Sequence, residues 1–283
     1  MIAGSTSRLA ERAFASAGLL SVLLPLGLLG LLLAAALAAA LPRLSVGFLL
    51  SPLSRDPAQA GIYTAALGSA LLVGLTAAIA VPLGVGAAVY LEEYRRQGRF
   101  ARLIELNIAS LAGVPSIIYG LLGLEIFVRV LGLGRSLLAG AATLALLILP
   151  LIVVSSREAL RTVPDSLREG AYALGATRLQ VVRGVVLPVA LPGILTGAVL
   201  AVSRALGETA PLLVLGAVAY AAAPDGLMSP LAALPVQLFH WSARPQAGFA
   251  ADAAAGIVVL VTILVAANGA AIVARDRATR GQR

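Results

Sequence analysis

The sequence predicts an all-α, polytopic membrane protein, and three observations support that prediction. Of its 283 residues, 60% are hydrophobic and only 12% are charged, whereas soluble domains carry about 25% charged residues. The apolar residues form runs long enough to cross hydrocarbon as helices, which takes roughly 20 residues. Helices are the expected form because their backbone groups pair internally, where lipid offers no partner.

Six apolar segments are expected to span the membrane. They run from Ala17 to Leu41, Thr64 to Tyr90, Asn107 to Val130, Leu137 to Val154, Val189 to Tyr220 and Ala253 to Ala274. Residues 1–16 then form a cytoplasmic N-terminal tail, and residues 17–283 form a single transmembrane domain. The alternative for the first segment is a signal peptide cleaved at Ala38-Ala39-Ala40. Its apolar run is about twice as long as a typical signal core, which favours a retained span.

Arginine placement predicts the orientation, since cytoplasmic segments of membrane proteins are enriched in positive charge. The chain has a net charge of +8, and all 21 of its basic residues are arginine. The inner set comprises Arg8, Arg12, Arg95, Arg96, Arg99, Arg102, Arg157, Arg161, Arg168, Arg178, Arg183, Arg275, Arg277, Arg280 and Arg283, and the outer set comprises Arg43, Arg55, Arg129, Arg135 and Arg244. This bias predicts that both termini are cytoplasmic.

The composition also argues against several other classes of protein. The chain contains no cysteine, so disulfides and thiolate zinc sites are excluded, and its single histidine is His240. We therefore expect no metal site. The arginines flank apolar runs rather than a soluble scaffold, which argues against nucleic acid binding. No paired acids or serine–histidine set suggests an enzyme.

Residues 155–188, between the fourth and fifth spans, are polar but show the pattern of a helical hairpin. A capping box is expected to start the first helix, and a left-handed glycine followed by a threonine cap is expected to separate it from the second. The residues in these positions are Thr162, Pro164 and Asp165 for the first helix, Gly175 for the turn and Thr177 for the second helix, which is expected to end at Leu187-Pro188. The hairpin is either an amphipathic connector lying on the membrane or a docking surface for a cytoplasmic partner.

The fifth span contains charges, which are costly in a bilayer and mark either a pathway or a pair. Arg204 and Glu208 are four residues apart and therefore share a helix face. Thr209 adds a hydroxyl, and Pro211 is expected to kink the helix because it lacks a backbone N–H. One interpretation is a structural ion pair that locks helices together. The other is an anion pathway, because guanidinium presents forked donors to an oxyanion.

The third span carries weaker signals of the same kind. Pro115 and its neighbouring glycines predict a bend, while Ser116 and Tyr119 supply hydroxyl groups. The alternative is a bend that serves only packing. Further along the span, the four-residue spacing of Glu125 and Arg129 predicts a structural pair.

The hairpin has a specific resemblance. Glutamate is followed by glycine after six positions and by Leu-Pro after eighteen and nineteen, which resembles the EAA loop of ATP-binding cassette (ABC) importer permeases. The matching residues are Glu169, Gly170, Ala171, Gly175, Leu187 and Pro188, with Gly170 in place of the usual alanine. The resemblance implies a type I ABC importer permease fold, in which this loop couples the spans to an ATPase. The chain has no Walker A motif, so ATP and Mg²⁺ belong to a separate subunit and no cofactor is expected here.

Three further runs, 90–94, 111–121 and 204–212, resemble phosphate-specific permeases of the PstA type, and the resemblance extends over about residues 60–275. It implies a phosphate pathway that includes Arg204, Glu208, Thr209, Ser116 and Tyr119. The first of these runs also contains Glu92 and Glu93, which we expect to be solvated at the inner end of the second span.

The resemblance also implies partners in a cell inner membrane. These are a second, homologous permease, two copies of a cytoplasmic ATPase and an extracytoplasmic phosphate-binding protein. A permease for molybdate or sulfate is the nearest alternative, because selectivity would lie mostly in the binding protein. A secondary carrier should show broken helices in both halves, and only one charged broken span is evident. A purely structural membrane protein would not need the docking loop.

Overall fold

The computed structural model describes residues 3–94, 103, 106–108 and 110–280. Within these residues the chain is helical and has no strand; one isolated bridge joins Ser136 to Pro230. Five helical stretches are long and apolar enough to cross a membrane: Ala10–Ala40, Tyr63–Tyr94, Leu137–Arg161, Arg178–Gly207 and Ala247–Ala270. The all-α, multi-spanning class is confirmed. The arginines at positions 95, 96, 99, 102 and 283 of the predicted inner set lie outside the described residues.

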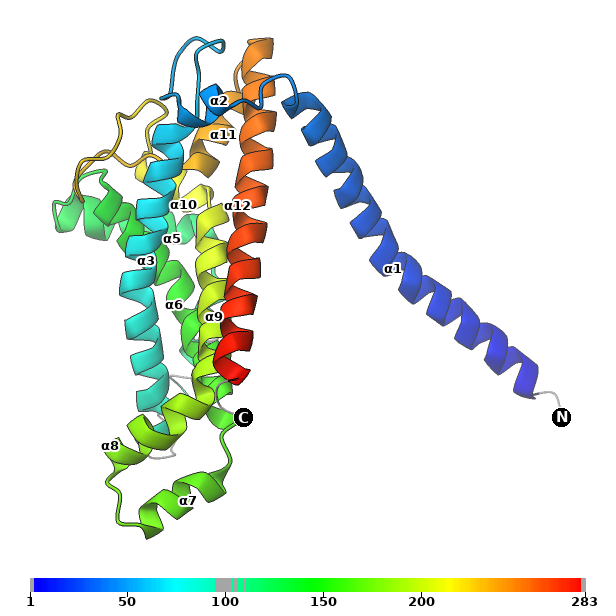
Figure 1. Ribbon diagram of the computed structural model, residues 1–283, viewed down its shortest axis with the longest axis vertical. Coiled ribbons are helices and arrows are strands. Elements are labelled where there is room, and N and C mark those ends of the chain that lie inside the picture. Colours follow the sequence, from blue (N-terminus) through cyan, green and yellow to red (C-terminus); the bar gives the residue numbers. More distant parts are fainter. Residues whose placement is uncertain (1–2, 95–102, 104–105, 109, 281–283) are drawn as a thin grey trace.

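Figure 1 shows the order and arrangement of the helices. Their bounds are α1 (Ala3–Ala40), α2 (Val46–Leu50), α3 (Tyr63–Val89), η1 (Tyr90–Tyr94), α5 (Ser116–Gly123), η2 (Leu124–Val130), α6 (Leu137–Arg161), α7 (Asp165–Ala173), α8 (Arg178–Val181), η3 (Val182–Val186), α9 (Leu187–Gly207), α10 (Ala210–Leu215), α11 (Leu234–Ser242) and α12 (Ala247–Arg280). The segments labelled η are π-helical, with hydrogen bonds that reach one residue further than in an α-helix.

The helix α6 lies at the centre of the bundle, between α3 and α9, and its side chains are mostly buried. Glycines bring the helices close together, as expected in a membrane, where small residues permit close backbone approach. A Cβ on Gly84 of α3 would lie 2.6 Å from Ile152 Cγ2, and one on Gly193 of α9 would lie 2.7 Å from Ala159 Cβ. These contacts fix the spacing of α3, α6 and α9.

The first helix differs from the rest because it leaves the bundle (Figure 1). Its membrane-length stretch, Ala10–Ala40, has no side chain buried in its most apolar window. Residues 3–16, within the predicted N-terminal tail, are helical and continuous with this span. An apolar helix without cover of its own requires lipid or another subunit along its length.

Two of the six predicted spans are interrupted rather than continuous. The third is broken at 112–115, where Pro115 precedes the first residue of α5. In the fifth, α9 ends at Gly207, Glu208 has an extended backbone, and α10 then carries Pro211 in its first turn. Both prolines therefore start helices, where their missing N–H has no consequence, and do not kink continuous ones as predicted.

The segments that were predicted to lie on opposite sides of the membrane lie at opposite ends of the molecule. At one end lie α7 and α8, together with the N-terminal end of α1 and the C-terminal end of α12. At the other end lie α2 and α11 (Figure 1). This arrangement is compatible with the arginine pattern.

A buried ion pair holds together the end of the molecule that bears α2 and α11. Arg43 follows α1, and its Nε donates to Asp252 Oδ1 of α12 at 2.5 Å. The carboxylate is fully buried. The same guanidinium donates to the carbonyls of Ala60, at 2.8 Å, and Pro57, so it joins the loop after α2 to the start of α12. The pair therefore fixes the point from which α1 leaves the bundle.

We expect Asp252→Asn to lower the free energy of unfolding by about 3 kcal/mol, because removing one partner of a buried pair leaves an uncompensated charge. The midpoint of thermal unfolding of the purified protein in detergent measures the change. Asp56→Asn is the matched control, since Asp56 is exposed in the same region, and its carboxylate accepts from the Ala58 N–H at 3.0 Å without forming an ion pair among the described residues. Equal losses in both variants would contradict a special role for the pair.

Candidate functional site

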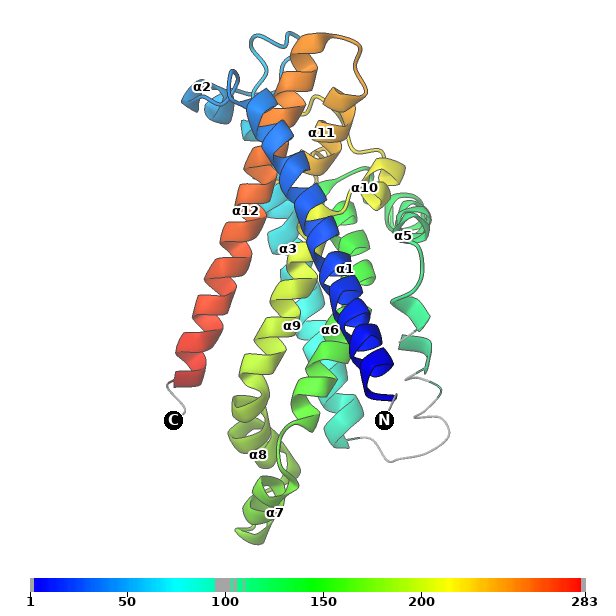
Figure 2. The ribbon, with the colours of Figure 1, turned by 90° about the vertical axis from the view of Figure 1, so that its right-hand side faces the viewer.

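The two interrupted spans meet at a close contact between α5 and α10 (Figure 2). A Cβ on Gly120 would lie 2.7 Å from Pro211 Cα and 2.9 Å from the Pro211 carbonyl oxygen. Only a glycine allows the two backbones to approach so closely. Beyond Pro211, α10 ends at Gly216, whose φ of +87° is the left-handed conformation that terminates helices.

The predicted charged pair lies at the break in the fifth span. Arg204 is in the last turn of α9, where a cation is stabilised by the negative end of the helix dipole. Its Nε lies 3.4 Å from Glu208 Oε1, and the two side chains are 54% and 16% exposed. Thr209 Oγ1 lies 3.5 Å from the Gly207 carbonyl oxygen. Both contacts are long for hydrogen bonds, so these polar groups are only loosely held.

Tyr119 brings the third span to the same region. Its side chain is buried, and its hydroxyl donates to the Leu111 carbonyl at 2.8 Å, which bridges the break before α5. Tyr119 precedes Gly120, the residue at which α5 contacts Pro211 of α10. Ser116 lies three residues earlier on the same helix, half-buried, and so shares a face with Tyr119. The predicted set is therefore gathered around one pair of helix breaks.

The predicted pair of Glu125 and Arg129 is also present. Arg129 Nη1 lies 2.9 Å from Glu125 Oε2, and both side chains are exposed. The pair lies on η2 and is local to that segment, in agreement with a structural interpretation.

The predicted hairpin forms with two of the three predicted capping features. Gly175 has a φ of +82°, the left-handed conformation expected after the first helix. The second helix starts with a capping box, in which the Gln180 side chain accepts from the Thr177 N–H at 2.7 Å. The predicted box at Thr162 is wrong: α7 follows Pro164, and the Thr162 hydroxyl donates back to Ala159 at the end of α6.

The second hairpin helix does not end at Leu187-Pro188. It continues from Arg178 to Gly207 as a single helical stretch. Proline usually marks a helix boundary because it lacks a donor and restricts the preceding residue. Here the turn before it is π-helical, and the Leu187 N–H donates to the Val182 carbonyl. This wider register accommodates the proline, so the hairpin is rigidly continuous with the fifth span.

The residues of the EAA-like pattern differ in exposure. Glu169 and Gly170 are exposed on α7, and the space around Gly170 is open. Leu174, at the end of the helix, is also exposed, whereas Ala171 is half-buried against the bundle. At the far end of the pattern, Leu187 is half-buried and Pro188 is exposed. One face of α7 therefore rests on the bundle and the other is free of contacts within the described chain.

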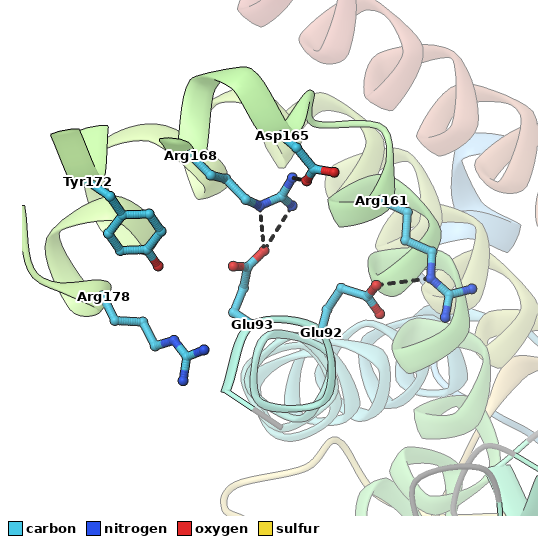
Figure 3. A pocket seen from close by; sticks show the side chains of 7 residues that line it. All are labelled: Glu92, Glu93, Arg161, Asp165, Arg168, Tyr172 and Arg178. Atoms are coloured by element: carbon cyan, nitrogen blue, oxygen red, sulfur yellow. Dashed lines mark hydrogen bonds and ion pairs between the residues drawn. The ribbon is translucent and has the colours of Figure 1, made fainter. Parts of the chain in front are cut away.

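The sequence did not reveal an ionic cluster that joins this hairpin to the ends of α3 and α6. Glu92 and Glu93, predicted to be solvated, instead bind arginines of α6 and α7 around a cavity of about 460 Å³ (Figure 3). Arg157 Nε and Arg161 Nε lie 3.2 and 3.1 Å from the carboxylate of Glu92. Arg168 Nη2 lies 2.9 Å from Glu93 Oε1. No local pattern could have revealed these pairs, because their partners are 65–75 residues apart.

The described residues contain no group of three or more His, Cys, Asp or Glu side chains that could hold a metal ion.

Comparisons with known proteins agree with this architecture. Residues 80–278 match the family described as "Binding-protein-dependent transport system inner membrane component". The chain is 38% identical to the phosphate transport system permease protein PstA 1 of Mycobacterium tuberculosis, over 79% of this chain and 72% of the relative. It is 35% identical to PstA of Haemophilus influenzae, over 81% and 80% of the two chains.

Solved structures show the same fold. A bacterial ABC transporter involved in the import of the acidic polysaccharide alginate aligns with a TM-score of 0.63 at 16% identity, covering 93% of this chain and 98% of that chain. The MetNI methionine ABC transporter, in an inward-facing conformation, aligns with a TM-score of 0.59 at 20% identity, covering 77% and 97%.

We expect Gly120→Ala to destabilise the protein by about 1–3 kcal/mol, the usual effect of inserting a methyl group into a closely packed contact. The added Cβ meets the Pro211 backbone, which no side-chain rotation relieves. Gly207→Ala is the control, because no atom lies within 4 Å of a Cβ at that position. Thermal unfolding midpoints of both variants in detergent test the expectation. A normal midpoint for Gly120→Ala would show that α5 and α10 separate without cost.

Proposed function

Because this chain belongs to the binding-protein-dependent transport system inner membrane component family, we propose that it is the transmembrane permease subunit of an ATP-driven phosphate importer. The relatives named above are phosphate transport permeases and cover most of the chain. The observation that carries the proposal is the loosely paired Arg204 beside two helix breaks. A charge at such a place in a membrane protein marks a substrate path by default.

Arg204 has the properties that a transient phosphate contact requires. Its guanidinium is more than half exposed, and its contact with Glu208 uses Nε. The forked terminal nitrogens of an arginine match the oxygens of a tetrahedral anion. Glu208 balances the charge when no anion is bound, and its repulsion of an anion favours release.

The alternative, a structural pair that locks helices together, is disfavoured by the geometry. Arg204 and Glu208 belong to one chain segment, four residues apart, so their contact joins no two helices. Exposed pairs of this kind contribute only about 0–1 kcal/mol to stability. In this proposal Tyr119, Ser116 and Thr209 line the same path with hydroxyl groups, which donate to a passing anion.

The hairpin is proposed to dock a cytoplasmic ATPase. The exposed face of α7 carries Glu169, Gly170 and Leu174, the type of mixed surface that a partner groove covers. Because the second hairpin helix is continuous with α9, movement of the dock is transmitted directly to the span that bears Arg204. Two ATPase copies would supply ATP and Mg²⁺ chemistry, one beneath each permease.

The remaining partners follow from the same proposal. A second, homologous permease completes the pathway, and it or lipid covers the unburied span α1. An extracytoplasmic phosphate-binding protein delivers phosphate at the end of the molecule that bears α2 and α11. Both termini then lie in the cytoplasm.

Distinguishing this chain from a secondary carrier requires a different argument from the one that the sequence suggested. The sequence suggested one charged broken span; the structure has two breaks, one at Arg204 and Glu208 and a second, uncharged one at 112–115. Broken helices therefore do not separate the two classes here. Family membership does so, because the match covers residues 80–278, which include the hairpin.

We expect Arg204→Gln to reduce the initial rate of phosphate uptake by roughly tenfold or more, since a hydrogen bond to a charged group contributes about 1.5–3 kcal/mol. Uptake of labelled phosphate is measured in cells that lack their own phosphate importers, with all subunits co-expressed and membrane levels checked. Arg129→Gln is the matched control, because Arg129 forms another exposed pair at the same four-residue spacing.

Each outcome decides one point. Equal uptake by the two variants would reduce Arg204 to a structural residue. A wild-type complex that assembles and hydrolyses ATP but moves no phosphate would overturn the cargo, and molybdate and sulfate would be tested next.

A further inference from the structure

We propose that Glu93 and Glu92 form an ionic clamp that holds the coupling hairpin against α3, so that movement of the ATPase dock reaches a second span. The clamp is defined as Glu92 and Glu93 of η1 with Arg157, Arg161 and Arg168. Its two glutamates are positioning residues, which act through the hairpin and do not touch phosphate. This inference rests on the function proposed above.

The link between Glu93 and Arg168 is the central contact of the clamp. Arg168 Nη2 and Nε lie 2.9 and 3.3 Å from the same oxygen, Oε1, of Glu93. The two side chains are only 16% and 7% exposed, for Arg168 and Glu93 respectively. Water therefore screens the pair poorly, and a forked guanidinium fixes the direction of approach as well as the distance.

Arg168 also binds the backbone where α6 ends. Its Nη2 donates to the Leu160 carbonyl at 3.0 Å, and its Nη1 donates to the Val163 carbonyl at 2.6 Å. One guanidinium thus joins the end of α3, the end of α6 and the first helix of the hairpin. Because Leu160 and Val163 are themselves buried, the arginine is anchored to the bundle core rather than to a mobile surface.

The hairpin needs such an anchor because α7 packs poorly by itself. None of its residues is buried, and Leu167 and Leu174 are exposed. Its apolar contact with the bundle depends on the half-buried Ala171 and on Val163 in the preceding turn. A small contact of this kind would allow the helix to tilt when a partner pulls on it, whereas a directed ion pair resists tilting.

The second glutamate strengthens the base of the clamp. Glu92 binds both Arg157 and Arg161, one helical turn apart on α6, so it ties the end of α3 to the end of α6. Figure 3 shows its contact with Arg161. Glu92 and Glu93 are neighbours in one π-helical turn but bind different elements. Glu92 binds arginines of α6, and Glu93 binds Arg168 of α7. A docked ATPase that moves α7 would carry α3 and α6 with it.

The experiment uses the complete transporter in proteoliposomes and measures phosphate uptake and ATP hydrolysis together. In Glu93→Gln, the ratio of uptake to hydrolysis is expected to fall roughly fivefold or more, in the range typical of coupling between sites. Asp165→Asn is the matched control: Asp165 also binds Arg168, at 3.0 Å, but within the hairpin and 88% exposed. Its ratio should stay within about twofold of wild type, as expected for an exposed pair.

A ratio unchanged in Glu93→Gln, or lowered equally in both variants, would overturn the clamp. Absence of phosphate uptake in wild type would instead overturn the proposed function. Should Glu93→Gln fail to assemble, trypsin cleavage after Arg178 in membranes provides the second readout. Cleavage should be faster than in Asp165→Asn, and equal rates would also overturn the clamp. Glu93→Asp, which retains the charge, should restore part of the coupling.

Discussion

The close packing of α6 between α3 and α9 is the interaction on which the rest of this structure depends. In lipid, apolar side chains gain little by burying against one another, so helices associate through van der Waals contact at small residues. Gly84 and Gly193 provide that contact on the two flanking helices. The same central helix receives α5 where Gly123 meets Thr143, and its C-terminal end carries Arg157 and Arg161 of the clamp. Both functional regions are thus attached to a single buried helix.

The two interrupted spans obey a second constraint of the bilayer. Non-helical backbone at membrane depth is tolerated only where protein covers it or where it lines a water-filled cavity. The breaks at 112–115 and at Glu208 lie beside each other, because α5 packs on α10 at Gly120. The Tyr119 hydroxyl donates to the carbonyl of Leu111, the residue before the first break. The two helix breaks therefore also supply the polar surroundings that Arg204 needs.

Hydropathy and spacing predicted the helical class, the long spans and the hairpin, because these features depend on the local pattern of apolar residues along the chain. They failed at two prolines for physical reasons. At Pro115 a bend was predicted within one span, whereas the helix is broken and starts again after the proline; at Pro188, where the hairpin was predicted to end, a π-helical turn carries the helix through. Glu92 and Glu93 were misjudged because their arginines are remote in sequence. The pathway role of Arg204 and the docking role of the hairpin remain predictions.

The arginines of the predicted inner set have a second role in the folded protein. Arg157, Arg161 and Arg168 count toward the bias that orients the chain, yet in the folded protein all three bind glutamates at the end of α3. Orientation requires only positive charge near the membrane surface during insertion. Once the chain folds, the same charges are positioned to join elements that must move together. A Lys substitution would preserve orientation but lose the forked geometry on which the Glu93 contact depends, so the exclusive use of arginine here suits both tasks.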